Sequence, residues 1–383
     1  MIKNKLKSLK DKFKNFKIDG YVIPKNDEFF SEYSKKDRLK LISNFSGSAG
    51  YAIILKKRNY LFVDGRYTIQ AQIESGSNFK VIDYQKIFNC NLFKNITLGI
   101  DPKLFTSSQI KKFFLKKNKI KEINENLVDT SSYYYKETSK PFFSLSANAI
   151  GENYKNKIKK IMIFLKKKRL NYIFISAPEN VAWLLNIRGN DSPNSPIPNC
   201  HLLLDIKKNI YLIGAKNKFS KLISKKEIII KKIINPNNIE IFLNSLKKGK
   251  ISIDFRTCSL FYENILKQKF KIINKEDPIY LLKSVKNSVE IQNMIDCHVH
   301  DGVALTKFLY WMKKTNKNKI TEFKAQNKLE SFRKRNINYL FPSFNTIAGS
   351  GKNAAIVHYR ATKNNTKIIN KDDIFLCDSG GQY

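Results

Sequence analysis

The sequence contains few cysteines, and their arrangement does not suggest a disulfide framework. Five cysteines occur among 383 residues, and no two of them form a CxxC pair. They are Cys90, Cys200, Cys258, Cys297 and Cys377. Three of them lie in apolar runs, which favours a reduced protein of the cytoplasm over a disulfide scaffold.

Long hydrophobic runs are also absent. The first stretch, MIKNKLKSLKDKFKNF, carries charge throughout and has no apolar core, so it does not resemble a secretory signal. No apolar stretch approaches the length that crosses a bilayer. We therefore expect no membrane partner.

Acidic residues are scarce relative to basic ones. The chain has 71 Lys and Arg against 32 Asp and Glu, a formal charge of +39 that can bind phosphate non-specifically. The excess is mostly Lys, spread evenly and accompanied by Asn and Ile, as in proteins from AT-rich genomes. Nucleic-acid sites tend to mix Arg and aromatic residues on one patch, and no such cluster is visible. We expect no specific nucleic-acid partner, and the salt dependence of any DNA retention tests the alternative.

The chain contains enough apolar residues for a folded protein with more than one core. Its content is 42% hydrophobic and 12% aromatic, which excludes general disorder. A length of 383 residues allows two or three domains.

Two successive segments repeat one order of predicted elements. Residues 6–16, 19–24, 49–65, 96–102 and 106–117 read as helix, strand, hairpin, strand and helix. The same order of helix, strand, hairpin, strand and helix repeats at an offset of about 150 residues. The second set of elements spans residues 154–170, 171–180, 200–215, 250–257 and 259–268. Alternating helix and strand favours a mixed sheet covered by helices, so we predict duplicated α/β domains at 1–140 and 141–282.

A third unit is predicted from residue 283 to 383. Apolar residues recur along 288–314 on one face of a long helix: Ile291, Met294, Ile295, Val299, Val303, Phe308 and Met312. A second helix follows over 321–335, with Thr321 as its N-cap. Strand-like runs at 342–351, 354–362 and 372–383 complete the chain without a closing element. We expect the beginning of a domain whose sheet is incomplete.

Several motifs invite a functional interpretation that their details do not support. GSGK at 349–352 is not a phosphate loop, because Thr346 and Asn353 replace the required Gly and Ser or Thr. FSGSAG at 45–50 lacks the GxSxG pattern and is better explained as a turn that needs glycine. His298 and His300 on one helix lack the i,i+4 spacing of metal ligands, so we expect one surface and one half-buried histidine.

Two polar residues directly follow short apolar runs that are typical of buried strands. His358 follows the run AAIV, and Asp378 follows IFLC. Both are candidate functional residues at strand ends. From the residues alone, a hydrogen-bonded structural histidine and a turn carboxylate capping the following SGG remain alternatives.

The whole chain resembles aminopeptidase P, the three-domain X-Pro aminopeptidase of the creatinase and methionine-aminopeptidase ("pita-bread") superfamily. Four motifs in the expected order carry this resemblance: SGSAGYAIILKKRNYLFVDGRY, PENVAWLLNIRGNDSPNSPIPNCHLLL, SFNTIAGSGKNAAIVHYRAT and LCDSGGQY. It implies two tandem creatinase N-terminal-like α/β domains, followed by the start of a pita-bread α+β catalytic domain.

The resemblance also implies a site and a reaction. The family removes the N-terminal residue from peptides with proline in second position, using two divalent ions, usually Mn²⁺, held by two Asp, one His and two Glu. Asp378 matches the first Asp ligand. His358 matches a substrate-contacting histidine, and Arg66 in DGRY matches an arginine that contacts the peptide. A structural salt bridge in the turn is the alternative for Arg66. A homodimer remains open.

The other ligands of that family would follow Tyr383. We therefore expect Asp378 to end a strand with no partner, without a second carboxylate facing it, and the chain to be an inactive fragment or one half of a split protein. A non-catalytic peptide- or protein-binding module of the same superfamily is the alternative function.

Overall fold

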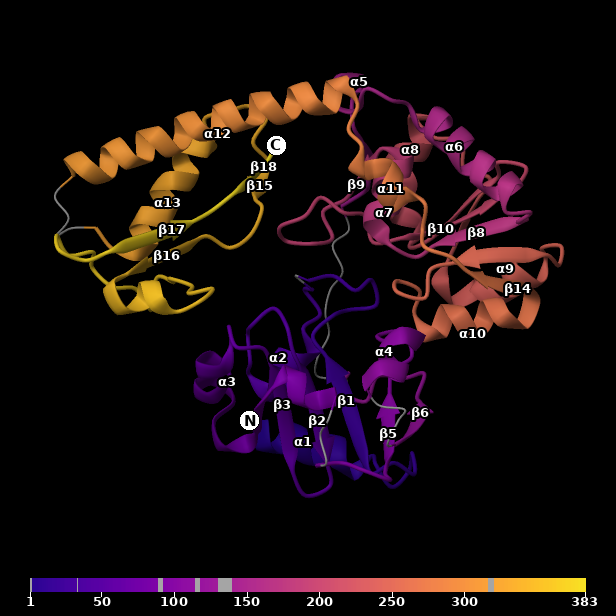
Figure 1. Cartoon of the computed structure of the whole chain (residues 1–383), viewed down its shortest axis with the longest axis horizontal. Helices are drawn as coiled ribbons and strands as arrows, with labels where there is room; N and C mark the ends of the chain where they lie inside the picture. Colours follow the sequence, from indigo (N-terminus) through magenta and orange to yellow (C-terminus); the bar gives the residue numbers. More distant parts are fainter. Residues whose placement is uncertain (1, 33, 89–91, 114–117, 130–139, 316–319) are drawn as a thin grey trace. The chain divides into compact units, whose positions relative to one another are not determined.

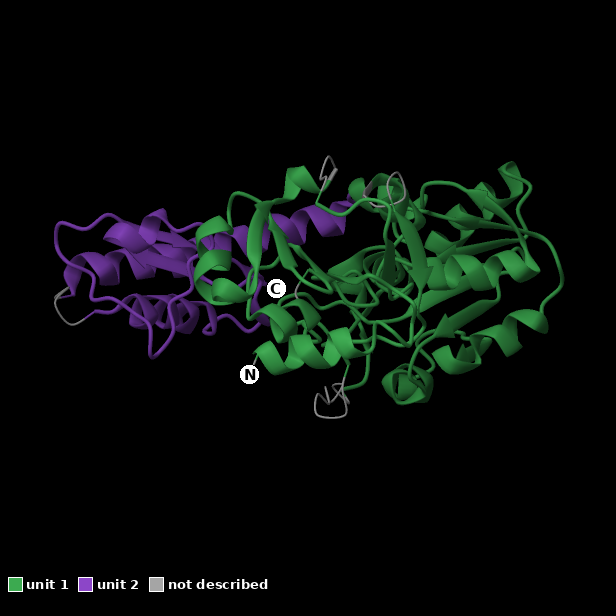
Figure 2. Ribbon diagram, turned by 90° about the horizontal axis from the view of Figure 1, so that it is seen from below, with its two compact units in different colours: residues 1–285 green, residues 286–383 purple. Residues whose placement is uncertain are grey.

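The structure, a computed structural model, describes residues 2–32, 34–88, 92–113, 118–129, 140–315 and 320–383. The chain divides into two compact units, residues 1–285 (unit 1) and 286–383 (unit 2), which are coloured separately in Figure 2. No helix within the described ranges is long and apolar enough to cross a membrane.

Unit 1 contains two six-stranded sheets with equivalent strand orders, β4-β3-β2-β1-β5-β6 and β12-β11-β10-β8-β13-β14 (Figure 1). The first sheet consists of β1 (Gly20–Pro24), β2 (Tyr51–Leu55), β3 (Asn59–Val63), β4 (Lys80–Asp83), β5 (Thr97–Ile100) and β6 (Lys119–Glu122). The second consists of β8 (Tyr172–Ile175), β10 (His201–Asp205), β11 (Ile210–Ile213), β12 (Lys232–Ile234), β13 (Lys250–Ile253) and β14 (Lys271–Asn274). The equivalent strand orders confirm the predicted duplication.

Each sheet is mixed, as the alternation of helix and strand predicted. The central strand β1 runs antiparallel to β2 and parallel to β5. Its counterpart β8 runs antiparallel to β10 and parallel to β13. The predicted hairpins are β2–β3, which turns over Lys56 and Lys57, and β10–β11, which turns over Lys207 and Lys208.

Both faces of each sheet are buried, which explains why the central strands are apolar without alternation. In β2, Ala52 and Ile54 belong to one hydrophobic cluster, whereas Tyr51 and Ile53 belong to the cluster on the other face. Successive side chains of a strand point to opposite faces, so two layers of helix and loop are needed to cover one sheet.

Helices surround both sheets. In the first half of unit 1, which contains the first sheet, the helices are α1 (Ile2–Asp11), α2 (Arg38–Ser43), α3 (Thr68–Ser75) and α4 (Ser107–Phe113). In the second half they are α5 (Ala147–Ile150), α6 (Tyr154–Lys167), α7 (Pro178–Leu185), α8 (Ser220–Ser224), α9 (Ile239–Asn244), α10 (Leu260–Lys269) and α11 (Ile279–Ser284). A short pair joins β7 (Phe143–Ser144), which precedes α5, to β9 (Ile187–Arg188), which follows α7. The last four residues of the helix predicted over 106–117 lie outside the described residues.

Unit 2 begins with the long helix α12 (Ser288–Lys314), whose N-terminus has a capping box between Asn287 and Glu290. Helix α13 (Glu322–Arg333) packs between α12 and strand β16 (Ile347–Ser350), as Figure 1 shows. The predicted cap is confirmed, because Thr321 Oγ1 accepts a hydrogen bond from Lys324 N at 3.2 Å. Strand β16 pairs with β17 (Phe375–Asp378), and β15 (Phe341–Pro342) pairs with β18 (Gly381–Gln382).

The strand predicted at 354–362 is wrong. Residues Gly351–Ala355 form a 3₁₀ turn, and Ile356 and Val357 are 38% and 49% exposed. In the described part of the chain no strand borders this run, so its backbone groups have no ladder to join and close into turns instead.

The apolar face predicted on α12 is buried only towards its C-terminal end. Phe308 is 1% exposed and packs with Ile320, Ala325 and Leu329, whereas Val299 is 61% exposed. Both His298 and His300 are exposed, so the expectation of one half-buried histidine is wrong.

Candidate active site

Arg66 lies in the turn after β3, where its guanidinium is locked onto Asp64. Asp64 Oδ1 accepts hydrogen bonds from Arg66 N at 3.0 Å and Nε at 2.9 Å, and Oδ2 accepts from Nη2 at 2.8 Å. The guanidinium also lies 5.3 Å from the centre of the Tyr67 ring. The salt bridge considered as the alternative is therefore present, yet the Arg66 side chain stays 47% exposed. The turn presents a fixed cation to solvent.

A cavity of about 280 Å³ lies next to this turn and includes Asp64 in its lining. The segment Phe30–Glu32 forms another part of the wall, together with Gly50 and Tyr51 from the FSGSAG turn and β2. The hydrogen bond with Asp64 is the main reason that the pKa of Arg66 is raised, and the nearby Glu32 carboxylate adds to the effect. Glu32 is thus an acidic residue close to the predicted peptide-contacting cation, and sequence reasoning did not single it out.

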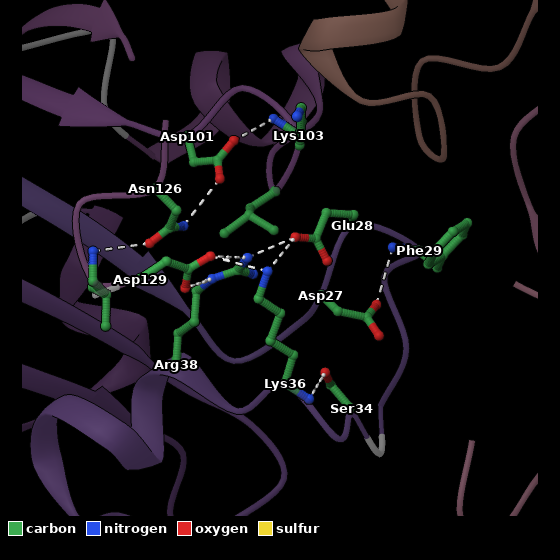
Figure 3. Close-up of polar contacts among 12 residues, drawn as sticks. Asp27, Glu28, Phe29, Ser34, Lys36, Arg38, Asp101, Lys103, Asn126 and Asp129 are labelled. Atoms are coloured by element: carbon green, nitrogen blue, oxygen red, sulfur yellow. Dashed lines mark hydrogen bonds and ion pairs between the residues drawn. The ribbon is translucent and has the colours of Figure 1, made fainter. Parts of the chain in front are cut away.

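The segment that carries Glu32 is held by a buried ion network around Arg38, shown in Figure 3. Arg38 is 2% exposed and donates to Glu28 Oε1 at 2.6 Å and to the two Asp129 oxygens at 2.8 and 2.9 Å. Lys36 forms ion pairs with the same two carboxylates, those of Glu28 and Asp129. Burial lowers the pKa of Arg38, but the hydrogen bonds to Asp129 and the charge of Glu28 outweigh it and raise the value overall. The network ties Glu28, Lys36 and Arg38 to Asp129, which follows the first sheet of unit 1.

The FSGSAG segment is a glycine turn, as predicted. A Cβ at Gly47 would meet the Phe45 ring at 2.2 Å, and one at Gly50 would meet the Phe62 carbonyl oxygen at 2.9 Å. The hydroxyl of Ser48 is hydrogen-bonded to Tyr67 Oη at 2.8 Å rather than to a base. The segment therefore shapes the cavity wall and carries no nucleophile.

Asp378 ends strand β17 in unit 2, which confirms its predicted position at a strand end. Phe375 and Cys377 pack against the core of unit 2, whereas Leu376 and Asp378 alternate to the exposed face. The expectation that this strand has no partner is wrong, because Asp378 pairs with Ile347 of β16. Within the described residues the Asp378 carboxylate forms neither a hydrogen bond nor an ion pair, so its oxygens are open to a ligand.

The residues after Asp378 are anchored from two directions. Strand β18 pairs with β15, and the Tyr383 hydroxyl donates to Asp301 Oδ1 of α12 at 2.6 Å. Arg333, 3% exposed on α13, holds the same carboxylate through Nε and Nη2 at 2.7 and 2.9 Å. The DSGGQY segment is thus tied to both helices of unit 2.

His358 does not stand at the end of a strand. It lies on the connection between β16 and β17, is exposed, and adopts a left-handed backbone conformation with φ of 58°. Its neighbour Tyr359 is 8% exposed and anchors the connection to the core of unit 2. His358 and Asp378 therefore belong to the same unit, and Arg66 belongs to unit 1.

A two-metal centre requires more ligands than the described residues bring together. In the described ranges no group of three or more His, Cys, Asp or Glu side chains converges as a metal site would require. Asp378 supplies a single hard oxygen ligand of the kind that suits Mn²⁺. The residues at hand therefore do not by themselves fit a two-metal centre.

Comparison with known proteins finds related domains along the whole chain. Residues 5–133 and 135–290 each match the Creatinase/Prolidase N-terminal domain, and residues 292–383 match metallopeptidase family M24. The chain is 32% identical to Xaa-Pro aminopeptidase 1 of Dictyostelium discoideum, covering 100% of this chain and 65% of that protein. It is 30% identical to the probable Xaa-Pro aminopeptidase P of Paracoccidioides brasiliensis, covering 99% of this chain and 67% of that protein. The chain thus spans about two thirds of the length of these relatives.

A solved structure shares the fold over the whole chain. The X-prolyl aminopeptidase of Caenorhabditis elegans, described as a cytosolic enzyme with a di-nuclear active site, superposes with a TM-score of 0.89 at 24% identity. The match covers 100% of this chain and 68% of the nematode chain. The solved structure shows the shared fold, and the family follows from the sequence matches: with the two domain types in the predicted order and 30% identity to the Paracoccidioides protein over two thirds of its length, the chain belongs to the Xaa-Pro aminopeptidase P family.

Proposed function

We propose that this chain takes part in removing the N-terminal residue from peptides with proline in second position. The observation that carries the proposal is Asp378, an exposed carboxylate at the end of β17, in a chain that belongs to a family of Xaa-Pro aminopeptidases. The fixed cation of Arg66 and the exposed imidazole of His358 are consistent with groups that contact a peptide.

Each of the three residues has a distinct proposed role. Arg66 binds a polar group of the peptide, because a guanidinium oriented by Asp64 still has exposed N–H donors. His358 donates a hydrogen bond to the oxygen on which negative charge develops as the peptide bond breaks. Asp378 is one ligand of a metal site, with Mn²⁺ as the proposed ion.

Metal binding would require more ligands than the described residues bring together. One carboxylate cannot compensate a divalent ion for the tightly held water that it must lose. We therefore propose that these residues alone are inactive and that a second segment carrying further ligands completes the site. A cytoplasmic location, like that of the nematode relative, and a homodimer belong to the same proposal.

Hydrolysis of a quenched Lys-Pro-Pro peptide in the presence of Mn²⁺ tests this proposal. The chain alone should show no turnover, and the chain mixed with the part of the Dictyostelium relative that it does not match should cleave the peptide. Asp378→Asn should abolish that cleavage, whereas Asp372→Asn, an exposed acid in the same stretch, should not. Turnover by the isolated chain that Asp378→Asn removes would contradict the proposed inactivity.

A peptide- or protein-binding module without catalysis is the second candidate function. It is favoured by the absence of a converging ligand group in the described residues and by the engagement of Arg66 with Asp64. Binding of an Ala-Pro peptide that survives Asp378→Ala, together with no cleavage in the complemented mixture, would select this alternative.

A further inference from the structure

Among the described residues of unit 2, Glu322 has the most extensively hydrogen-bonded carboxylate, and it is none of the site residues predicted above. It is the first residue of α13 and is 0% exposed. Its Oε1 accepts from Ser350 N at 2.7 Å and from Asn353 Nδ2 at 3.0 Å. Its Oε2 accepts from the Tyr359 hydroxyl and from Lys367 N, both at 2.9 Å. Four donors thus fill the acceptor positions that two carboxylate oxygens offer.

The four donors lie at the end of β16 and along the connection that leads to β17. Ser350 is the last residue of β16, Asn353 lies at the start of the connection, Tyr359 in the middle and Lys367 towards its end. The backbone completes the attachment, because Glu322 N donates to Lys367 O at 3.0 Å and Phe323 N donates to Thr366 Oγ1 at 3.0 Å. One residue therefore fastens both ends and the middle of residues 350–367 to the N-terminus of α13.

The connection between β16 and β17 forms no regular strand. Besides the contacts to Glu322 and Phe323, it has a 3₁₀ turn at Gly351–Ala355, isolated bridges of Thr362 with Asn365 and of Ile368 with Thr321, and an ion pair between Lys367 and Asp373. Ile356 and Val357 are exposed, and His358 holds the left-handed conformation, which is uncommon for residues other than glycine. Tyr359 follows His358 directly, and its hydroxyl connects this part of the chain to Glu322.

We infer that Glu322 is the positioning residue that fixes residues 350–367, and through Tyr359 the orientation of His358. The importance of this positioning for function rests on the proposed role of His358 in contacting the peptide. The effect of Glu322 on residues 350–367 can be measured separately. A group that holds the contacting residue without touching the peptide acts by pre-organisation. Such a role predicts a local effect of substitution, confined to the fastened segment.

Nuclear magnetic resonance of the full chain can measure this local effect. The sequence has four histidines, so comparison with His358→Gln assigns the ring signals of His358. In Glu322→Gln the NH2 group of the side-chain amide replaces one acceptor oxygen. Because this group cannot accept a hydrogen bond from the donors that it faces, at least one of the four hydrogen bonds is lost. We expect the Ser350 and Lys367 amides to exchange with solvent at least about tenfold faster and the His358 ring signals to shift.

Two further variants separate positioning from general stability. Glu330→Gln, on the same helix but paired with the exposed Lys334, should leave both readouts unchanged. Tyr359→Phe removes one of the four hydrogen bonds and should shift the His358 signals with a smaller change in exchange. Unchanged His358 signals in both Glu322→Gln and Tyr359→Phe, or equal acceleration of exchange throughout unit 2, would overturn the inference.

Addition of an Ala-Pro dipeptide to the wild-type chain tests the proposed function independently. A shift of the His358 signals supports peptide contact by that residue. If the dipeptide causes no shift while Glu322→Gln still loosens residues 350–367, the role of His358 fails and the positioning by Glu322 stands.

Discussion

At the scale of single residues, the backbone near the candidate site depends on one glycine. Gly351 has φ of +55°, and a Cβ there would lie 2.9 Å from both Asp373 Oδ1 and Lys367 Nζ. These two side chains form an ion pair at 3.1 Å beside the segment that carries His358. Neither the backbone conformation nor the available space suits a larger residue.

Gly351→Ala should therefore lower the free energy of unfolding of unit 2 by about 1–3 kcal/mol. Gly302→Ala in α12 is the matched control, because a Cβ there meets nothing within 4 Å and alanine favours the helix. Urea unfolding followed by Trp311 fluorescence in a Trp183→Phe background reports unit 2 alone. Equal stability of the two alanine variants would show that Gly351 imposes no constraint.

A buried carboxyl group makes unit 1 sensitive to pH. Burial raises the pKa of Asp277 to about 6, and its neighbours Asn180 and the Ile279 amide offset only part of that effect. A raised folded-state pKa gives stability that is complete below the unfolded value near 4 and is lost as the pH rises through 6. The expected loss is on the order of 3 kcal/mol between pH 4 and pH 7.

Asp277→Asn should remove most of that decline, since an amide does not titrate. Unfolding at pH values from 4 to 7, followed by Trp183 fluorescence in a Trp311→Phe background, measures it in unit 1. The exposed Glu125→Gln serves as the control and should retain the decline. A pH dependence identical in Asp277→Asn and wild type would refute the assignment.

The sequence predicted some site residues and missed others for physical reasons. The position of Asp378 at a strand end was predicted because an apolar run followed by Asp, Ser and two glycines indicates a strand and then a turn, whereas its role as a ligand is implied only by the family resemblance. The strand expected before His358 failed because a strand needs a neighbour, which local apolarity does not reveal. Glu322 was missed because its partners lie 28 to 45 residues away along the chain. A Thr-Glu helix start was its only local signal.

At the scale of elements, the strands of the two six-stranded sheets that the sequence did not predict are the four edge strands. They are β4, β6, β12 and β14, and each begins with a lysine. Edge strands are short and carry charge that discourages pairing with other chains. The same lysines interrupt the apolar pattern by which a strand is predicted from sequence. Strands buried on both faces were therefore predicted, and edge strands were not.

A buried lysine connects two helices of the second half. Lys157 of α6 is 1% exposed and donates to Trp183 O at 3.0 Å and to Asn186 Oδ1 at 2.7 Å. Its ammonium also lies 4.0 Å from the centre of the Trp183 ring. Trp183 O and Asn186 are at the C-terminal end of α7, where a cation is favoured by the helix dipole.

Lys157→Met should destabilise unit 1 by about 2–4 kcal/mol, because buried acceptors lose their donor. Lys159→Met on the exposed side of α6 should change the stability by less than about 0.5 kcal/mol. Denaturant unfolding of both variants measures the difference. Matching midpoints would mean that Lys157 contributes no more than a surface lysine.

At the scale of the whole molecule, the two units differ in how well they cover their apolar side chains. Unit 1 has clusters on both faces of two sheets. The cluster of unit 2 has five buried members, and Ile337 and Ile374 are 96% and 81% exposed. A smaller core implies a smaller free energy of local opening.

Limited proteolysis should therefore cut first within residues 286–383 and leave a resistant fragment ending near Val285. Mass spectrometry of early fragments identifies the cut sites. Equal rates of cleavage in the two units would contradict the difference in core size.

The claim that Asp378 is one ligand of a metal site which other residues must complete is tested most directly by metal content. After dialysis against Mn²⁺, the isolated chain should carry no stoichiometric ion. Its mixture with the unmatched part of the Dictyostelium relative should carry about two ions per complex, as two-metal sites do. Asp378→Ala should lose that uptake and His358→Ala should retain it. Two Mn²⁺ ions on the isolated chain, or full uptake by the Asp378→Ala mixture, would contradict the account.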